Sequence, residues 1–132
     1  THASILTITS NPTRTSPVNR GKWILEQILG TPPPPPPPDV GELEENEEAI
    51  TSGTLRERLE KHRAKTECAT CHSKMDPLGF ALENFDGIGA WRDLDGNFPI
   101  DPSGELPTGE TINGPEGLKK VLKSRETFIR AL

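Results

Sequence analysis

The stretch Cys68-Ala69-Thr70-Cys71-His72 constrains the fold of this chain more than any other. Two cysteines separated by two residues and followed at once by a histidine are the pattern of c-type haem attachment. Residues three apart lie on one face of a helix, so both thiols would reach the same porphyrin edge and form thioethers. His72 would then bind the iron from the proximal side. The rest of the chain would have to fold around a covalently held haem.

Three other interpretations of these five residues are weaker. A thioredoxin-like redox pair would follow a strand in a βαβ context, and no such pattern precedes Cys68. A zinc site needs a second ligand cluster, whereas the chain has 2 cysteines and 3 histidines in all. A disulfide between Cys68 and Cys71 would close a very small loop and stabilise little. Haem attachment is therefore the favoured interpretation.

The composition indicates an interior that side chains alone would fill poorly. Of 132 residues, 31% are hydrophobic and 5% aromatic, and 14 prolines and 12 glycines interrupt them. A haem would add a large apolar surface. The net charge of -5 disfavours nucleic acid and favours a basic redox partner protein or a bound cation. No run approaches the roughly 18 apolar residues of a membrane span, so we expect no span.

Three segments follow one another along the chain. Residues 1–30 predict an extended segment or weak strand over Ala3–Thr9, and then an amphipathic helix from Ser16-Pro17 to Gly30. Residues 31–52 hold seven consecutive prolines, from Pro32 to Pro38, and an acidic loop. The proline run predicts a polyproline II rod, interpreted as a stiff spacer, with a ligand for an SH3 or WW module as the alternative. Residues 53–132 form the predicted haem c module.

The module begins with a predicted helix that has the capping-box pattern, Thr54 followed three residues later by Glu57. An attachment helix over Cys68–Lys74 comes next. Asp76-Pro77 then predicts the start of a separate helix, with aspartate as the cap and proline in the first turn. Short helices of this kind, placed around one covalent haem, predict a mainly α, cytochrome-c-like fold class.

A small β-hairpin region follows in the prediction. Asp95-Gly96 indicates a hairpin, Pro102-Ser103-Gly104 a turn, and Glu110–Ile112 a strand. A last helix opens at Gly114-Pro115 and runs to Leu132 without a cap. The opening residues look like an internal start, so we expect the chain to be a processed piece of a larger protein.

The distal side of the iron decides the function. His62 shares an inward-facing stripe with two leucines and is the first candidate for the second axial ligand; a hydrogen bond to a propionate or carbonyl is its other role. A vacant or water-bound position is the next candidate, followed by His2, a lysine and Met75. Met75 stands three residues after His72 on one helix, so its sulfur cannot cross the ring. With two strong axial ligands the iron has no open coordination site, and the module can only exchange electrons. An open distal face would instead allow the iron to bind small ligands.

Two further cofactor contacts are predicted near the hairpin. Arg92 is a candidate to pair a haem propionate, with a plain surface arginine as the alternative. The stretch Asp93-Leu94-Asp95-Gly96-Asn97 suggests Ca2+, because oxygen ligands alternate along it. It fails as an EF-hand loop, since Phe98 stands where glycine is needed and Gly104 where glutamate is needed. Calcium elsewhere, between carboxylates and a propionate, stays a secondary prediction.

Two long blocks of the sequence resemble a known group of proteins. The first runs from Thr7 to Pro38 and contains Arg14-Thr15-Ser16-Pro17-Val18-Asn19-Arg20-Gly21-Lys22-Trp23, and the second runs from Cys68 to Asp86. Together they resemble the C-terminal cytochrome-c-type modules of large exported planctomycete proteins, known as domains of unknown function. The resemblance implies haem c. Thioether attachment occurs outside the cytoplasm, so we expect an exported protein, periplasmic or at the cell surface.

The function predicted from these residues is electron transfer by a c-type cytochrome module with one covalent haem, an electron carrier rather than an enzyme. The alternative is a haem module with an open distal face that binds small ligands, as a peroxidase-like enzyme or a sensor. A third hypothesis is an interaction module scaffolded by the polyproline segment, with haem as its structural core.

Overall fold

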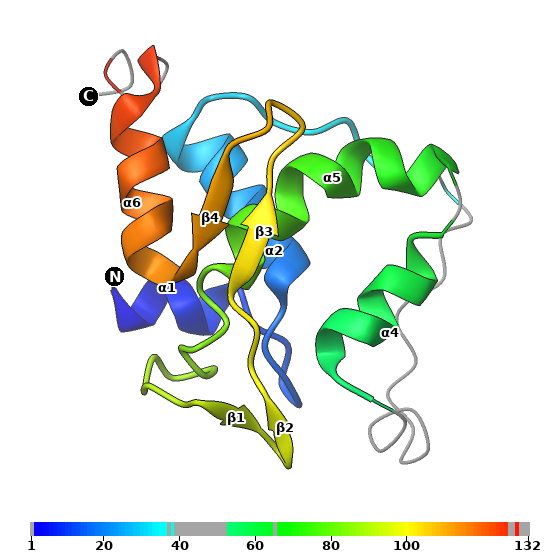
Figure 1. The fold of residues 1–132 in the computed structure, drawn as a ribbon, viewed down its shortest axis with the longest axis vertical. Helices are drawn as coiled ribbons and strands as arrows, with labels where there is room; N and C mark the ends of the chain where they lie inside the picture. The colour runs from blue at the N-terminus through cyan, green and yellow to red at the C-terminus, as the bar shows by residue number, and fades with distance from the viewer. Residues whose placement is uncertain (1, 37, 39–52, 65, 127–128, 130–132) are drawn as a thin grey trace.

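The fold is built on one long helix, α5 (Thr66–Phe80), which carries the Cys68–His72 stretch in its N-terminal half. The computed structural model describes residues 2–36, 38, 53–64, 66–126 and 129 (Figure 1). Around α5 lie the other helices, α1 (Ala3–Ile8), α2 (Pro17–Trp23), the π-helical turn η1 (Ile24–Ile28), α4 (Leu55–His62) and α6 (Gly114–Ser124). The prediction of short helices beside a small hairpin region is confirmed.

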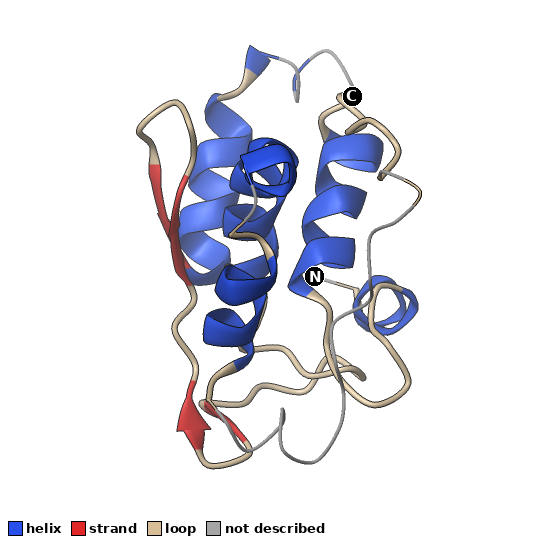
Figure 2. Cartoon of the chain, turned by 90° about the vertical axis from the view of Figure 1, so that its right-hand side faces the viewer, coloured by secondary structure: helices blue, strands red, loops and turns tan. Residues whose placement is uncertain are grey.

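Two antiparallel hairpins lie along one side of the molecule, as Figure 2 shows. In the first, β1 (Leu94–Asp95) pairs with β2 (Phe98–Pro99) around Gly96, whose φ of 60° suits glycine. In the second, β3 (Ser103–Glu105) pairs with β4 (Thr111–Asn113). The predicted hairpin and the later strand are confirmed. The predicted turn at residues 102–104 is wrong, because Gly104 runs in β3 close against Pro77, where a Cβ would lie 2.8 Å from the proline ring.

The helices α2 and α5 touch through their backbones. A Cβ on Gly21 of α2 would overlap the carbonyl oxygen of Met75, and one on Gly79 of α5 would overlap the carbonyl oxygen of Pro17. Two glycines, one on each helix, therefore let the axes approach more closely than side chains would permit. This contact fixes α5 against the N-terminal part of the chain.

One hydrophobic core joins the N-terminal helices to the rest of the fold. Its buried members come from α1, η1, α5, the segment after α5, the β3–β4 hairpin and α6: Leu6, Ile24, Leu25, Met75, Leu78, Ala81, Leu82, Leu106, Ile112, Leu118, Val121 and Leu122. A second cluster places Leu55 and Leu59 of α4 against Phe80. Among the described residues, no helix has both the length and the apolar character that crossing a membrane requires.

The N-terminal segment corrects one prediction and confirms another. Residues predicted as extended form α1, in which the hydroxyl of Thr7 donates to Ala3 O at 2.9 Å and that of Thr9 to Ile5 O at 2.6 Å. Burial of Leu6 in the core outweighs the strand preference of these β-branched residues, and the threonine hydroxyls bond back to carbonyls of the preceding turn. The helix predicted at Ser16 is confirmed, since the Ser16 hydroxyl accepts from Asn19 N at 3.2 Å.

The predicted break at Asp76-Pro77 is wrong, because α5 continues through both residues to Phe80. Proline inside a helix removes one backbone hydrogen bond, here the one to Ser73. Burial of Pro77 under β3 offsets that loss. Asp76 does not cap a helix, and its carboxylate bonds to two side chains described below.

The other predicted boundaries have mixed outcomes. The capping box of α4 is confirmed, because Thr54 Oγ1 accepts from Glu57 N at 3.1 Å and Glu57 Oε2 accepts from Thr54 N at 2.8 Å. Helix α6 ends at Ser124, where Arg125 has an extended conformation, so the predicted unbroken run through Arg125 is wrong. Glu126 and Ile129 are again helical, and the predicted end at Leu132 lies outside the described residues. Residues 31–36, which include most of the proline run, have no regular secondary structure, and the predicted polyproline rod stays a prediction. The predicted acidic loop lies outside the described residues.

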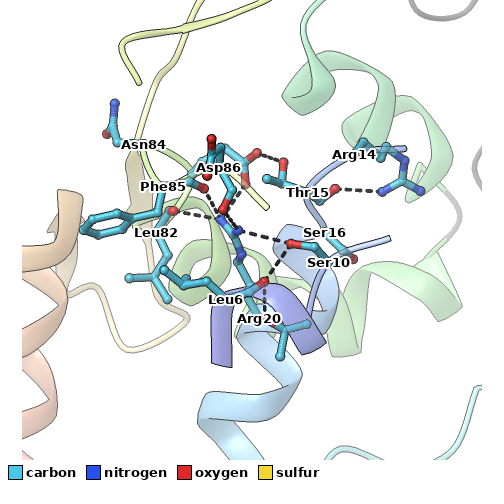
Figure 3. Close-up of polar contacts among 12 residues, drawn as sticks. Leu6, Ser10, Arg14, Thr15, Ser16, Arg20, Leu82, Asn84, Phe85 and Asp86 are labelled. Atoms are coloured by element: carbon cyan, nitrogen blue, oxygen red, sulfur yellow. Dashed lines mark hydrogen bonds and ion pairs between the residues drawn. The ribbon is translucent and has the colours of Figure 1, made fainter. Parts of the chain in front are cut away.

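The segment that follows α5 is held by one buried arginine (Figure 3). The side chain of Arg20 is 1% exposed. Its Nη1 donates to the carbonyl oxygens of Leu82 at 2.9 Å and Phe85 at 2.7 Å, and its Nη2 donates to Asp86 O at 2.8 Å and to Ser10 Oγ at 3.2 Å. A guanidinium suits this role because its planar fork of donors reaches several carbonyls at once.

Candidate functional site

The site predicted from the sequence lies on the N-terminal half of α5. Cys68 and Cys71 are both free thiols, three residues apart and partly exposed, and Cys71 also packs on the core. The side chain of His72 is 17% exposed. The expectation that the three side chains share one helix is confirmed, since α5 contains all of them without a break.

A fully buried carboxylate orients His72. Asp76, one turn further along α5, is 0% exposed, and its Oδ1 lies 3.0 Å from His72 Nδ1. An ionised carboxylate only accepts hydrogen bonds, so His72 donates through Nδ1–H. In the neutral imidazole, this bond leaves the lone pair of the other ring nitrogen, Nε2, for a metal. Ligand histidines in proteins are typically held in this way by a carboxylate or carbonyl.

The second oxygen of the same carboxylate is bonded from another helix. Arg63, the residue that follows α4, donates from Nη1 to Asp76 Oδ2 at 2.8 Å. Its Nη2 lies 3.5 Å from Oε1 of the partly exposed Glu60. We call Arg63, Asp76 and His72 the proximal chain. Sequence reasoning missed it, although the spacing of four between His72 and Asp76 could have indicated that their side chains meet on a helix.

A groove of about 630 Å³ lies beside the proximal chain, between α4, α5 and β3. Its lining includes Arg63 and Asp76, together with Phe80 on α5 and Glu105 on β3. Arg56 of α4 covers the Phe80 ring, with its guanidinium carbon 4.0 Å from the ring centroid. Within the part of the chain that the structure describes, the lining of this groove includes no cysteine and no histidine, so the thiols and the imidazole lie on neighbouring parts of the α5 surface.

The candidates for the distal ligand are placed on three different elements. His62 is the last residue of α4 and is partly buried, whereas His2 precedes α1 and is exposed. Met75 is buried in the core on α5, with its backbone against Gly21. Its position on the helix of His72 agrees with the argument against it as a distal ligand. The choice among these candidates stays a prediction.

Arg92 is engaged by protein groups on three sides. It donates from Nη2 to Glu83 Oε1 at 2.8 Å and to Thr15 Oγ1 at 3.0 Å, and from Nη1 to Asp95 Oδ1 at 2.6 Å. Burial raises the pKa of Glu83, while the hydrogen bond from Thr15 and the charges of Arg20 and Arg92 act in the opposite direction. A haem propionate would have to compete with these partners, so the predicted propionate contact gains no support here.

The acidic residues of the first hairpin are also occupied. Asp95 bonds to Arg92, and Asp93 Oδ1 accepts from Trp91 Nε1 at 3.1 Å. Across the described residues, no three His, Cys, Asp or Glu side chains are grouped so that they could hold a metal ion by themselves. The secondary prediction of calcium therefore gains no support from the geometry.

These observations define a small domain of short helices and two hairpins, whose central helix presents two free thiols and one oriented imidazole. The chain belongs to the PSCyt3 family, described as a protein of unknown function (DUF1588), whose model matches residues 1–95. The matched residues include both sequence blocks that resemble planctomycete cytochrome-c-type modules, and the resemblance is consistent with the match. No curated protein and no solved structure matches the chain.

Proposed function

We propose that this chain is a c-type cytochrome module that carries one covalent haem and transfers electrons within an exported redox protein. The observation that carries the proposal is the bond between His72 and the buried Asp76, on the helix that also carries two free thiols, Cys71 directly before His72 and Cys68 one turn before it. The short name of the family, PSCyt3, supports the same assignment.

The residues on α5 fit this prosthetic group. Cys68 and Cys71 would hold the porphyrin by thioethers, because thiols at this spacing are free and on one helix. His72 would bind the iron through Nε2, since Nδ1 is committed to Asp76. When bound, haem supplies an iron that alternates between ferric and ferrous states. The chain's own contribution would be to attach the group through Cys68 and Cys71 and to orient the His72 imidazole.

The test is covalent attachment. Produced in cells that attach haem c outside the cytoplasm, the protein is expected to keep a Soret band after denaturation and to gain the mass of one haem. Exchange of both thiols, Cys68→Ala with Cys71→Ala, should abolish both signals. The matched control is Ser73→Ala, which changes a nearby polar residue of α5 and leaves the attachment residues intact. Unmodified mass and no Soret band in the parent protein would overturn the proposal.

The distal ligand separates electron transfer from small-ligand chemistry. For an electron carrier with His62 as the second ligand, we expect a low-spin ferric spectrum that carbon monoxide does not alter in the ferrous form. His62→Ala should then give a high-spin spectrum and rapid binding of carbon monoxide. A parent protein that already binds carbon monoxide would instead support the alternative, a haem module with an open distal face. An unaltered low-spin spectrum in His62→Ala would exclude His62.

A further inference from the structure

We propose that Asp76 and Arg63 are positioning residues that act in opposite directions on His72 and together set the reduction potential of the iron that it binds. The inference rests on the proposed function and assigns a role to two residues outside the attachment sequence. Its basis is the proximal chain, in which one buried carboxylate is shared between an imidazole and a guanidinium.

Because Asp76 is fully buried, its bonds to His72 and Arg63 must replace the hydrogen bonds that its carboxylate would make with water. A carboxylate removed from water is costly unless its oxygens are paired with donors. Asp76 is 0% exposed, and each oxygen has one donor, His72 at 3.0 Å and Arg63 at 2.8 Å. The carboxylate is therefore held in place from both sides, and the imidazole plane of His72 is fixed with it.

The two donors come from different helices. His72 and Asp76 lie one turn apart on α5, whereas Arg63 follows the last turn of α4. The side chain of Arg63 is 26% exposed, and it contacts Glu60, which also lines the groove. The effect of Arg63 on Asp76, and through it on His72, thus depends on the placement of α4. The chain of contacts runs from a partly exposed arginine to the imidazole.

The carboxylate and the guanidinium act on the imidazole with opposite signs. A carboxylate that accepts the Nδ1 proton raises the basicity of the ring, which strengthens Nε2 as a donor and favours the ferric state. A guanidinium on the other oxygen withdraws charge from that carboxylate and weakens the effect. Asp76 should therefore lower the potential, and Arg63 should raise it.

Three variants of the holoprotein and one control test this directly. In Asp76→Asn the potential should shift upward, because an amide oxygen is a weaker acceptor than a carboxylate. In Arg63→Met it should shift downward, and in Arg63→Lys it should stay near the parent value because the cation is kept. Glu105→Gln is the matched control. It removes one negative charge from the same groove, from an exposed residue of β3, and should shift the potential less than Asp76→Asn does.

A second readout follows the imidazole itself. In ferrous protein labelled with ¹⁵N-histidine, the Nδ1 resonance of His72 should report a strong hydrogen bond in the parent, a weaker one in Asp76→Asn and a stronger one in Arg63→Met. A purely structural role would lower stability without moving this resonance. If Asp76→Asn does not fold, the inference is tested by Arg63→Met, which changes a partly exposed residue and should lower the reduction potential.

The possible failures are distinct. A parent protein without covalent haem overturns the proposed function. Covalent haem in every variant, with Asp76→Asn no different from Glu105→Gln in potential and with an unchanged Nδ1 resonance, overturns the inference alone. Shifts of the same sign in Asp76→Asn and Arg63→Met also overturn it, because the two residues would then not oppose each other.

Discussion

Gly79 of α5 lies directly against the carbonyl group of Pro17 in α2, with no room for a side chain between them. The reciprocal contact, Gly21 of α2 against the carbonyl of Met75, repeats the arrangement one turn later in α2 and one turn earlier in α5. The helix that carries the attachment residues is thus fixed by backbone contacts on its C-terminal half. Its N-terminal half, with both cysteines, is left partly exposed.

Gly79→Ala should destabilise the protein by about 1–3 kcal/mol or more, because the new methyl group must push α2 and α5 apart. The free energy of unfolding from urea titration measures the loss. Gly117→Ala is the matched control. Gly117 lies on α6, and a Cβ there would meet only atoms of Ile112 in β4, none closer than 3.5 Å, so the exchange should stabilise the helix by about 0.5–1 kcal/mol. Equal effects at the two glycines would contradict the close approach of α2 and α5.

Arg20→Met should cost about 3–5 kcal/mol, because three carbonyl groups after α5 lose their donor and the buried carboxylate of Glu83 loses one of its two arginines. Thermal or urea unfolding checks the loss. Arg20→Lys should recover only part of it, since one ammonium cannot span the carbonyls of Leu82, Phe85 and Asp86. Full recovery with lysine would show that charge alone, and not the fork of donors, is what the site requires.

The turn at Asp86 makes stability depend on pH in the acid range. The backbone N–H of Ala90, helped by that of Ile88, holds the pKa of the Asp86 carboxyl below its ordinary value of 3.8. The native state then binds fewer protons than the unfolded state, so this contribution is present above pH 3.8 and is lost as the pH falls through the native pKa. In Asp86→Asn the amide oxygen can still accept both bonds, but it cannot titrate.

The expected result is a stability difference between the parent and Asp86→Asn that narrows as the pH is lowered from 6 toward 3. Denaturant midpoints of both proteins at each pH provide the measurement. A difference that stays constant over this range would show that the carboxylate contributes nothing beyond the geometry of the turn.

Local signals in the sequence predicted local structure correctly. The capping box at Thr54, the cap at Ser16 and the hairpin at Asp95-Gly96 are each decided within about four residues, and each is confirmed. The grouping of Cys68, Cys71 and His72 on one helix is of the same kind, because the helical repeat alone brings them together.

Contacts between distant residues were beyond the sequence patterns. Arg20 bonds to carbonyls more than 60 positions away, and nothing near it in the sequence distinguishes it from a surface arginine. Asp76 before Pro77 is typical of a helix start, so its burial inside α5 could not be foreseen from those two residues. Its bond to Arg63 depends on how α4 packs on α5, which no local pattern encodes.

Arg92 is predicted from the sequence to bind a haem propionate. In the structure it bonds to Glu83, and stability measurements can separate these two roles. Its Nη2 bonds to the carboxylate of Glu83, which is buried and also bonded by Thr15. If the role is internal, Arg92→Met should cost about 1–3 kcal/mol, because a buried carboxylate loses one of its donors. Glu83→Gln should cost a similar amount, since two arginines then lose their anion.

The double variant Arg92→Met with Glu83→Gln should cost less than the sum of the single variants, because each exchange removes the same bond. Urea titration of the four proteins gives this coupling. For a residue that serves only Glu83 and its neighbours, the reduction potential of the holoprotein should be the same with arginine or methionine at position 92. A large shift in potential, with additive losses of stability, would instead support the contact of Arg92 with a propionate.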